Sequence, residues 1–168
     1  MHIRPVNVQS DVQKITEIYN YYVENSPQTF ETEPISTNEM ARRIDEIISE
    51  NYPFLVAEDK EEILAYAYSK RFLLDRAFEY TASVAIYVKA DKTHKGIGTA
   101  LYLQLFDELA KTDFHTLIAA ISLPNETAVR FHEKLGFKKV AHFYEVGYKL
   151  GRWIDVGYWQ KMNIISDE

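Results

Sequence analysis

The sequence predicts a mixed α/β (α+β) fold, a single domain over residues 1–168 in which helices flank one central sheet. Strand-like runs of alternating β-branched and aromatic residues, such as 80–89, recur along the chain. Between them lie helical stripes, for example Val12, Ile15 and Tyr19, whose apolar side chains fall on one face. The chain has no internal repeat, linker or low-complexity segment, so both patterns are expected to build one core.

The predicted elements follow the order βααβββαβαββ. A capping box formed by Ser36 and Glu39 begins the second helix, and Gly136 ends the last one. Strands are expected at 2–6, 52–57, 63–68, 80–89 and 116–121, helices at 11–23, 36–51, 98–111 and 125–135, and two final strands within 138–162 that turn at 150–152. This order places a strand directly before a glycine-containing loop and a helix directly after it.

Composition and charge limit the classes of function. The chain carries a formal net charge of −6, a pI near 5.4 and no long basic run, which argues against nucleic-acid binding. It has no cysteine, so we expect no disulfide, no zinc cluster of thiolates and no acyl-cysteine intermediate. We also expect no metal cofactor. No apolar run approaches the ~20 residues of a membrane span, and the first residues lack the apolar region of a signal peptide. We therefore expect a cytoplasmic protein that binds neither nucleic acid nor membrane.

The segment 84–105 predicts an anion-binding site. A strand containing Ile86 and Val88 leads into Lys-Gly-Ile-Gly-Thr at 95–99, and a helical apolar stripe follows. The first N–H groups of a helix lack internal partners and its dipole is positive there, which favours phosphate or pyrophosphate. Gly-x-Gly before a helix also fits a plain tight turn. The better-known three-glycine motif is excluded because Leu101 stands at the third glycine position.

A second stretch, residues 123–137, strengthens this prediction. Pro124 and Asn125 begin a helix that contains His132 and ends at Gly136. Asn125 and His132 are seven residues apart, so they are expected to face the same side of that helix.

These two stretches together resemble the acetyl-CoA core of the GNAT-type N-acetyltransferases. Residues 29–34, 121–125 and 147–160 further resemble the phosphinothricin acetyltransferase branch, and the 147–160 segment is the most specific part of the match. The resemblance covers nearly the whole chain. It implies a mostly antiparallel sheet splayed around acetyl-CoA. It also implies direct acetyl transfer to the amine of a small amino acid or amino-acid analogue, of the phosphinothricin or methionine-sulfoximine kind.

The resemblance also implies the acetyl-CoA contacts. The pantetheine arm is expected along the backbone of Ile86, Tyr87 and Val88, with the Val88 N–H receiving the carbonyl oxygen. Asn125 is expected to hydrogen-bond the same arm, with a simple helix cap as the alternative reading. The family prefers arginine or glutamine where this chain has Thr93. The pyrophosphate contacts are expected from His94, Lys95, Gly96, Ile97, Gly98 and Thr99.

Catalysis is expected to depend on His132, Ser83 and Glu79. The phosphinothricin branch has histidine where the wider family often has a tyrosine acid, and a pKa near ~6.5 lets His132 carry a proton in either direction at neutral pH. A lone helical histidine is otherwise a structural residue. The branch has a glutamate where this chain has Ser83, and a hydroxyl alone is no base at pH 7. The amine proton is therefore expected to leave through His132, Glu79, or water held by Ser83 and the tyrosines.

The resemblance places substrate contacts at Phe30, Arg76 and Tyr80. Asp75 stands where the branch has an arginine for an anionic group, which argues against phosphinothricin itself as the acceptor. Two other functions remain open. One is a catalytically weak CoA-binding sensor, favoured by Ser83, and the other is a protein or peptide N-acetyltransferase, which needs an open acidic groove. A homodimer is expected from the resemblance and from a surplus of aromatic residues, namely Tyr144, Tyr148, Trp153, Tyr158 and Trp159.

Overall fold

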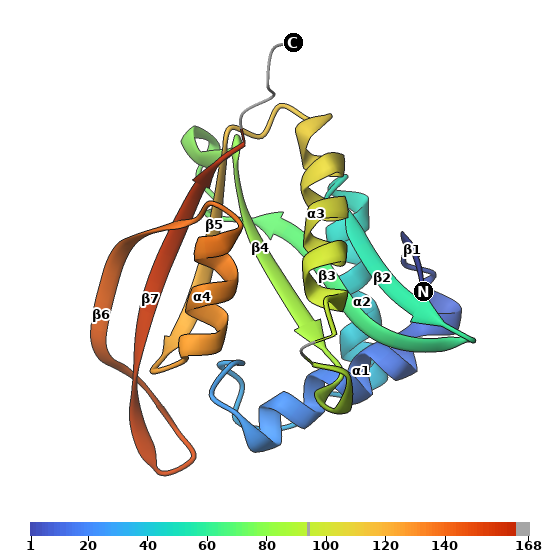
Figure 1. Ribbon diagram of the computed structural model, residues 1–168, viewed down its shortest axis with the longest axis horizontal. Helices are drawn as coiled ribbons and strands as arrows, with labels where there is room; N and C mark the ends of the chain where they lie inside the picture. The colour runs from blue at the N-terminus through green and yellow to red at the C-terminus, as the bar shows by residue number, and fades with distance from the viewer. Residues whose placement is uncertain (94, 164–168) are drawn as a thin grey trace.

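A seven-stranded sheet organises the computed structural model, which describes residues 1–93 and 95–163 (Figure 1). The strands are β1 (His2–Pro5), β2 (Phe54–Asp59), β3 (Glu62–Arg71), β4 (Thr81–Val88), β5 (Thr116–Leu123), β6 (Lys138–Lys149) and β7 (Arg152–Met162). The α-helices are α1 (Val8–Asn25), α2 (Thr37–Ser49), α3 (Ile97–Ala110) and α4 (Glu126–Lys134), and short 3-10 turns lie at Arg76–Phe78 and Ala90–Lys92. The predicted order of strands and α-helices is confirmed.

The start of the first helix differs from the prediction. α1 begins at Val8 because the Asn7 side chain accepts hydrogen bonds from N–H groups of the first turn. Asp11, where the helix was expected to start, is a buried residue whose carboxylate lies 2.7 Å from the Arg4 guanidinium. This ion pair joins α1 to β1.

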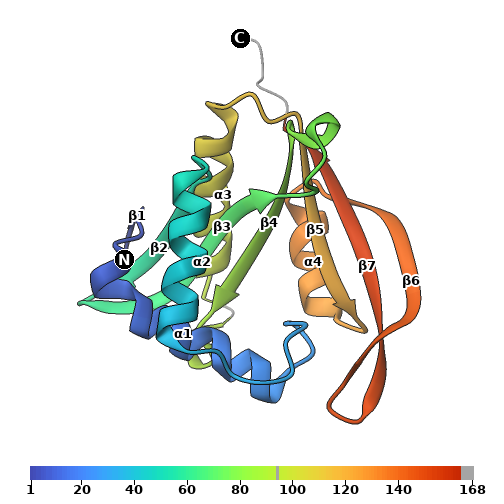
Figure 2. The same ribbon diagram turned by 180° about the vertical axis from the view of Figure 1, so that it is seen from behind.

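Helices cover both faces of the sheet. α3 and α4 lie on the near face in Figure 1, and α1 and α2 lie on the other face, which is in front in Figure 2. Leu101, Leu105 and Leu109 of α3 are fully buried against the sheet, as are Ile15 and Ile44 on the opposite face. Burial of each such side chain contributes about 1.5–3 kcal/mol. No helix in the described ranges is long and apolar enough to cross a membrane.

The sheet opens between its two central strands. Its strand order is β1-β2-β3-β4-β5-β7-β6, and every neighbouring pair is antiparallel except β4 and β5. These two parallel strands pair only from Thr81 with Thr116 to Ser83 with Ile118. Beyond Ser83 they diverge, and Figure 2 shows the widening gap. The expectation of a mostly antiparallel, splayed sheet is confirmed.

β6 and β7 form a long hairpin at the edge of the sheet (Figure 1). It turns at Leu150 and Gly151, both with positive φ, as the sequence predicted. Trp159, expected on an aromatic dimer surface, is instead a core residue. A Cβ at Gly157 would lie 2.4 Å from the Trp159 ring, so glycine is what leaves room for the indole. The exposed aromatic residues of the predicted set are Tyr144, Tyr148 and Trp153.

Candidate functional site

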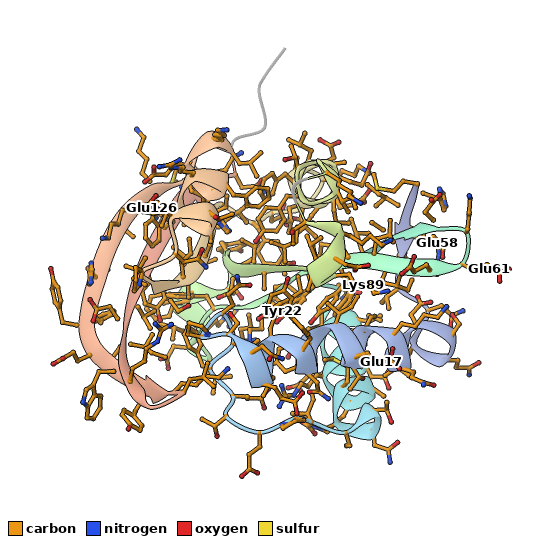
Figure 3. The ribbon with its side chains drawn as sticks, turned by 60° about the horizontal axis from the view of Figure 1, so that its bottom comes forward. Glu17, Tyr22, Glu58, Glu61, Lys89 and Glu126 are labelled. Atoms are coloured by element: carbon orange, nitrogen blue, oxygen red, sulfur yellow. The ribbon has the colours of Figure 1, made fainter. Side chains whose placement is uncertain are left out.

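The backbone of β4 is open on the side that faces the gap. The Lys89 N–H donates to Leu64 O at 2.8 Å, toward β3. Because backbone groups alternate in direction along a strand, those of Ile86 and Val88 point the other way, toward the diverging β5. Tyr22 of α1 donates its hydroxyl to Val88 O, and Figure 3 shows Tyr22 near Lys89 at this end of the strand. The N–H groups of Ile86 and Val88 therefore face the gap.

A small cavity of about 80 Å³, here called the gap cavity, lies between β4, β5, α3 and α4. Its lining brings together the predicted residues Ile86, Tyr87, Asn125 and His132. The remaining lining residues are Gln28, Val84, Ala85, Tyr102, Ala120, Ile121, Ser122 and Ala128. The Ser122 hydroxyl is buried and has no hydrogen-bond partner among the described residues. A ligand in the gap cavity would satisfy this hydroxyl.

His132 is held in one tautomer at the wall of the gap cavity. Its Nδ1 lies 2.8 Å from Ala128 O and therefore carries the proton, since a carbonyl oxygen only accepts. Nε2 is then an acceptor, 3.4 Å from the Tyr102 hydroxyl. Burial lowers the pKa of His132 below 6.5, and the hydrogen bond to Ala128 O offsets this only in part. The imidazole is therefore neutral at pH 7.

Asn125 caps α4 and also lines the gap cavity. Its Oδ1 accepts a hydrogen bond from the Ala128 N–H at 3.1 Å, which is the cap that the alternative reading expected. That bond uses only the oxygen, so the side-chain amide keeps two N–H donors. Asn125 and His132 both line this cavity, which confirms that they share one side of the helix.

The glycine loop leads into α3 as the sequence predicted. Gly96 has a φ of +76°, in the left-handed region that glycine adopts without a Cβ penalty. The first helical hydrogen bond runs from the Ala100 N–H to Gly96 O at 3.1 Å. The N–H groups left without helical partners are those of Ile97, Gly98 and Thr99. Three such donors at a positive helix end suit a phosphate group.

The remaining residues of this loop have simpler surroundings. Lys95 is exposed, and Thr93 donates its hydroxyl to Ala90 O at 3.3 Å. His94, a predicted pyrophosphate contact, lies outside the described residues. A Cβ at Gly98 would lie 3.5 Å from the Phe131 ring. A side chain longer than one carbon at Gly98 would therefore crowd α4.

A larger cavity of about 1020 Å³, here called the acceptor-side cavity, lies across β4 from the gap cavity. α1, α2 and the connection between them form one wall, and β6 and β7 form another. The predicted residues Phe30 and Ser83 line it. Several residues line both cavities, namely Gln28, Val84, Ala85, Tyr87 and Ala120. The two cavities therefore adjoin at the β4–β5 gap.

Of the predicted catalytic and substrate residues, three line neither cavity. Arg76 has a side chain 92% exposed, 3.9 Å from the Glu79 carboxylate, and Tyr80 is also exposed. All three lie in or next to the 3-10 turn that precedes β4. That turn is at the closed end of the β4–β5 pair, whereas the gap opens at the other end. The structure therefore does not bring Arg76, Glu79 or Tyr80 together with His132.

An ion pair lines the acceptor-side cavity. Arg43 of α2 donates to both carboxylate oxygens of Glu31, at 2.6 and 2.9 Å, and Tyr19 donates its hydroxyl to the same group. The hydrogen bonds from Arg43 lower the pKa of Glu31, so this carboxylate is ionised at neutral pH. Burial, assisted by Glu31, raises the pKa of Tyr19, so its hydroxyl stays protonated.

Stacked aromatic rings from β2, β3 and β4 also line the acceptor-side cavity. The Phe54 and Tyr68 ring centroids lie 5.2 Å apart, as do those of Tyr66 and Tyr87. Burial raises the pKa of Tyr68 to about 12, so its phenol is neutral. The buried Tyr66 hydroxyl has no hydrogen-bond partner in the described part of the chain. The cavity therefore offers a largely apolar, aromatic surface.

The sequence did not predict the positions of Tyr102, Ser122 and Glu31 in these cavities. Tyr102 lies one helical turn after Gly98, and this spacing signals that it faces the same side of α3. Ser122 is a polar residue inside an apolar strand, which is a signal for a buried polar role. Glu31 lies within the 29–34 segment, but its pairing with Arg43 joins two elements and has no local signal.

Comparison with known proteins agrees with this geometry. Residues 3–157 match the family described as "Acetyltransferase (GNAT) domain". The chain is 37% identical to a phosphinothricin N-acetyltransferase of Streptomyces coelicolor, covering 96% of this chain and 95% of the relative. It is 30% identical to an L-methionine sulfoximine/L-methionine sulfone acetyltransferase of Salmonella typhimurium, covering 90% and 89%. A solved phosphinothricin acetyltransferase from Sinorhizobium meliloti in complex with AcCoA has a TM-score of 0.92 at 31% identity, covering 96% of this chain and 87% of that one. Because the family match spans nearly the whole chain and includes both motifs at the gap, this protein belongs to the GNAT acetyltransferase family of enzymes.

Proposed function

We propose that this protein is an acetyl-CoA-dependent N-acetyltransferase that moves an acetyl group directly to the amine of a small amino acid or amino-acid analogue. The observation that supports this most is the meeting of the two cavities at the β4–β5 gap, where Val84, Ala85 and Tyr87 line both. A donor on one side of β4 and an amine on the other side can therefore come into contact. Such direct transfer needs no covalent enzyme intermediate.

Acetyl-CoA fits the residues on the gap side. The pyrophosphate would be held by the N–H groups of Ile97, Gly98 and Thr99, and the pantetheine arm would run along the open edge of β4. The Val88 N–H, which faces the gap, would donate to the thioester oxygen as its negative charge grows. Ser122 and Asn125 supply further polar contacts. The complex of the Sinorhizobium meliloti relative with AcCoA supports this assignment.

His132 acts as a proton acceptor in this proposal. Its Nδ1–H is committed to Ala128 O and its pKa is lowered by burial, so the neutral ring takes a proton at Nε2. The amine proton would pass to Nε2, and the same proton would then neutralise the leaving thiolate. Ser83 lines the acceptor-side cavity and can orient the amine or a water molecule. Glu79 remains the next candidate base, although it lines neither cavity.

The acceptor class rests on the relatives. These relatives are named as acetyltransferases of phosphinothricin, L-methionine sulfoximine and L-methionine sulfone, all small amino-acid analogues. A protein or peptide acceptor is less well supported because the carboxylates of the acceptor-side cavity are neutralised. The ion pairs concerned are Glu31 with Arg43, Glu46 with Arg42, and Glu50 with Arg71.

A steady-state assay of CoA thiol release tests the proposed function. The panel would contain L-amino acids, L-methionine sulfone, L-methionine sulfoximine and phosphinothricin, with mass spectrometry of the N-acetyl product. We expect amine-dependent thiol release with at least one member of the panel. Calorimetric binding of acetyl-CoA without turnover of any amine would favour the CoA-binding sensor instead.

We extend the proposal to a homodimer that forms through the β6–β7 hairpin. Tyr148 and Trp153 contact each other edge to face, with ring centroids 5.0 Å apart, and both are exposed. The large exposed apolar residues of this hairpin are Val140, Phe143, Tyr144, Val146, Tyr148, Leu150, Trp153 and Met162. Exposed aromatic and apolar side chains in this number are typical of a protein interface. A cytoplasmic location stays a prediction from the sequence.

A further inference from the structure

Lys70 lies directly opposite Ser83 in the sheet. The register of β3 and β4 pairs these two residues, so their Cα atoms are about 5.5 Å apart and their side chains lie on the same face. Both residues line the acceptor-side cavity, Lys70 as an exposed residue and Ser83 as a half-buried one. Ser83 is also the last position at which β4 and β5 pair. Lys70 and Ser83 therefore lie where β4 and β5 begin to separate, on the wall of the acceptor-side cavity.

Lys70 differs from the other cations of this cavity in its pairing. Arg43 pairs with Glu31 at 2.6 Å, and Arg71 pairs with Glu50 at 3.3 Å. The third lining carboxylate, Glu46, pairs with Arg42 at 3.0 Å, at the rim. No carboxylate of residues 1–93 or 95–163 lies within 4.0 Å of the Lys70 ammonium. The lining therefore holds three carboxylates and three cations, and Lys70 is the lining cation with no carboxylate partner among the described residues.

The rest of the lining is suited to an uncharged side chain. Besides the stacked rings of β2, β3 and β4, apolar side chains from α2, the β3–β4 connection and the hairpin surround the space. They include Met40, Ile44, Ile47, Phe72, Leu73 and Phe143. The Tyr66 hydroxyl is buried and has no hydrogen-bond partner among the described residues, and it adds no charge to this lining. A second anionic group would find no free cation here, because Arg76 lines neither cavity.

We infer that Lys70 binds the carboxylate of the acceptor, and that the acceptor is an α-amino acid with a single anionic group and a largely apolar or aromatic side chain. This inference rests on the proposed acetyltransferase function and names its substrate more closely. The carboxylate lies against Lys70 and Ser83, which directs the amine toward the gap and the side chain toward the aromatic rings. Phosphinothricin, which carries a phosphinate as well as a carboxylate, is a poorer acceptor than an amino acid with a neutral side chain.

The test combines a charge reversal at Lys70 with a pair of substrates, one with a carboxylate and one without. L-Phenylalanine and 2-phenylethylamine share an aromatic side chain and an amine, but only the first has a carboxylate. Lys70→Glu should raise the KM for L-phenylalanine at least tenfold and leave the KM for 2-phenylethylamine within about twofold. Lys70→Arg should retain the L-phenylalanine KM within about threefold, because it keeps the charge. The KM for acetyl-CoA should stay unchanged in both variants.

Lys138→Glu is the matched control. Lys138 is an exposed lysine of β6 that lines neither cavity, so its reversal changes the net charge equally without changing the proposed site. The role of Lys70 would be overturned if Lys70→Glu raised the KM for L-phenylalanine and for 2-phenylethylamine equally. It would also be overturned if Lys138→Glu raised the KM for L-phenylalanine as much as Lys70→Glu does. A wild-type kcat/KM higher for phosphinothricin than for L-phenylalanine would overturn the inferred substrate. If acetyl-CoA binds but no amine is acetylated, the proposed function is refuted, and the inference with it.

Discussion

Replacement of His132 by glutamine tests the proton path with little disturbance of the fold. Glutamine is neutral, as His132 is at pH 7, and its amide N–H can still donate to Ala128 O, but it cannot accept a proton. If His132 takes the amine proton at Nε2, His132→Gln should lower kcat by about 10²-fold or more. The Kd for acetyl-CoA should remain within about threefold, because proton transfer acts in the transition state.

The His132→Ala variant measures how much of the loss of kcat comes from a loss of stability. The His132 ring lies edge to face with Phe131, Tyr102 and Phe137, at centroid distances of 5.3 to 5.5 Å. His132→Ala empties this buried position and should lower the free energy of unfolding by about 1–3 kcal/mol. His132→Gln should lower it less. A kcat loss that follows the stability loss across the two variants would make His132 a structural residue.

The pH dependence gives a second readout. Burial lowers the pKa of His132 in the folded chain, so the unfolded chain binds more protons between that value and 6.5. Stability should therefore fall as the pH falls through this range, and the acid limb of kcat should lie below pH 6.5. Urea unfolding and steady-state rates from pH 5 to 8 measure both effects. A His132→Gln enzyme with unaltered kcat and an unaltered acid limb would refute the reasoning.

Three further changes test other parts of the site. Gly98→Asp should abolish calorimetric binding of acetyl-CoA, because the new side chain and its charge would stand against the phosphate; unchanged binding in a folded variant would exclude the glycine loop. Ser83→Glu should gain little turnover of 2-phenylethylamine by itself, because the introduced carboxylate would pair with Lys70 across the strands and become a weaker base. Adding Lys70→Met should raise that turnover about tenfold, and equal rates for the single and double variants would contradict the pairing. Trp153→Asp should convert a homodimer into a 19.6 kDa monomer in light scattering, whereas a monomeric wild type at micromolar concentration would contradict the dimer.

The features that the sequence predicted correctly are those with local causes. Helical and strand periodicities depend on neighbouring residues, so the order of elements followed from them. Asn125 and His132 share a face because seven residues make two helical turns. Gly96 and Gly98 precede a helix because the apolar stripe begins directly after them. Each of these inferences needed no knowledge of the sheet.

The features that the sequence did not predict depend on strand register and on contacts between elements. Lys70 and Ser83 are separated by a long connection, and only the register of β3 with β4 makes them neighbours. The sequence predicted Trp159 on an aromatic surface. The pairing of β5 with β7 instead places it in the core beside Gly157. Arg76 seemed suited to bind an anion, but the 3-10 turn holds it away from both cavities.

One buried lysine explains why the most specific part of the family resemblance lies far from the acetyl-CoA contacts. Lys149, in the 147–160 segment, is 5% exposed and donates to both Thr29 O and Thr29 Oγ1 at 2.9 Å, across 120 residues of sequence. Burial lowers the pKa of Lys149, so oxygen atoms must compensate for lost hydration, and Thr29 supplies two of them. The contact holds the 29–34 segment in place, and that segment carries Phe30 and Glu31 on the wall of the acceptor-side cavity. In the proposed function, the tail therefore shapes the acceptor side of the enzyme and the glycine loop serves the donor side. This division would account for a tail that is specific to a branch and a loop that is common to the whole family.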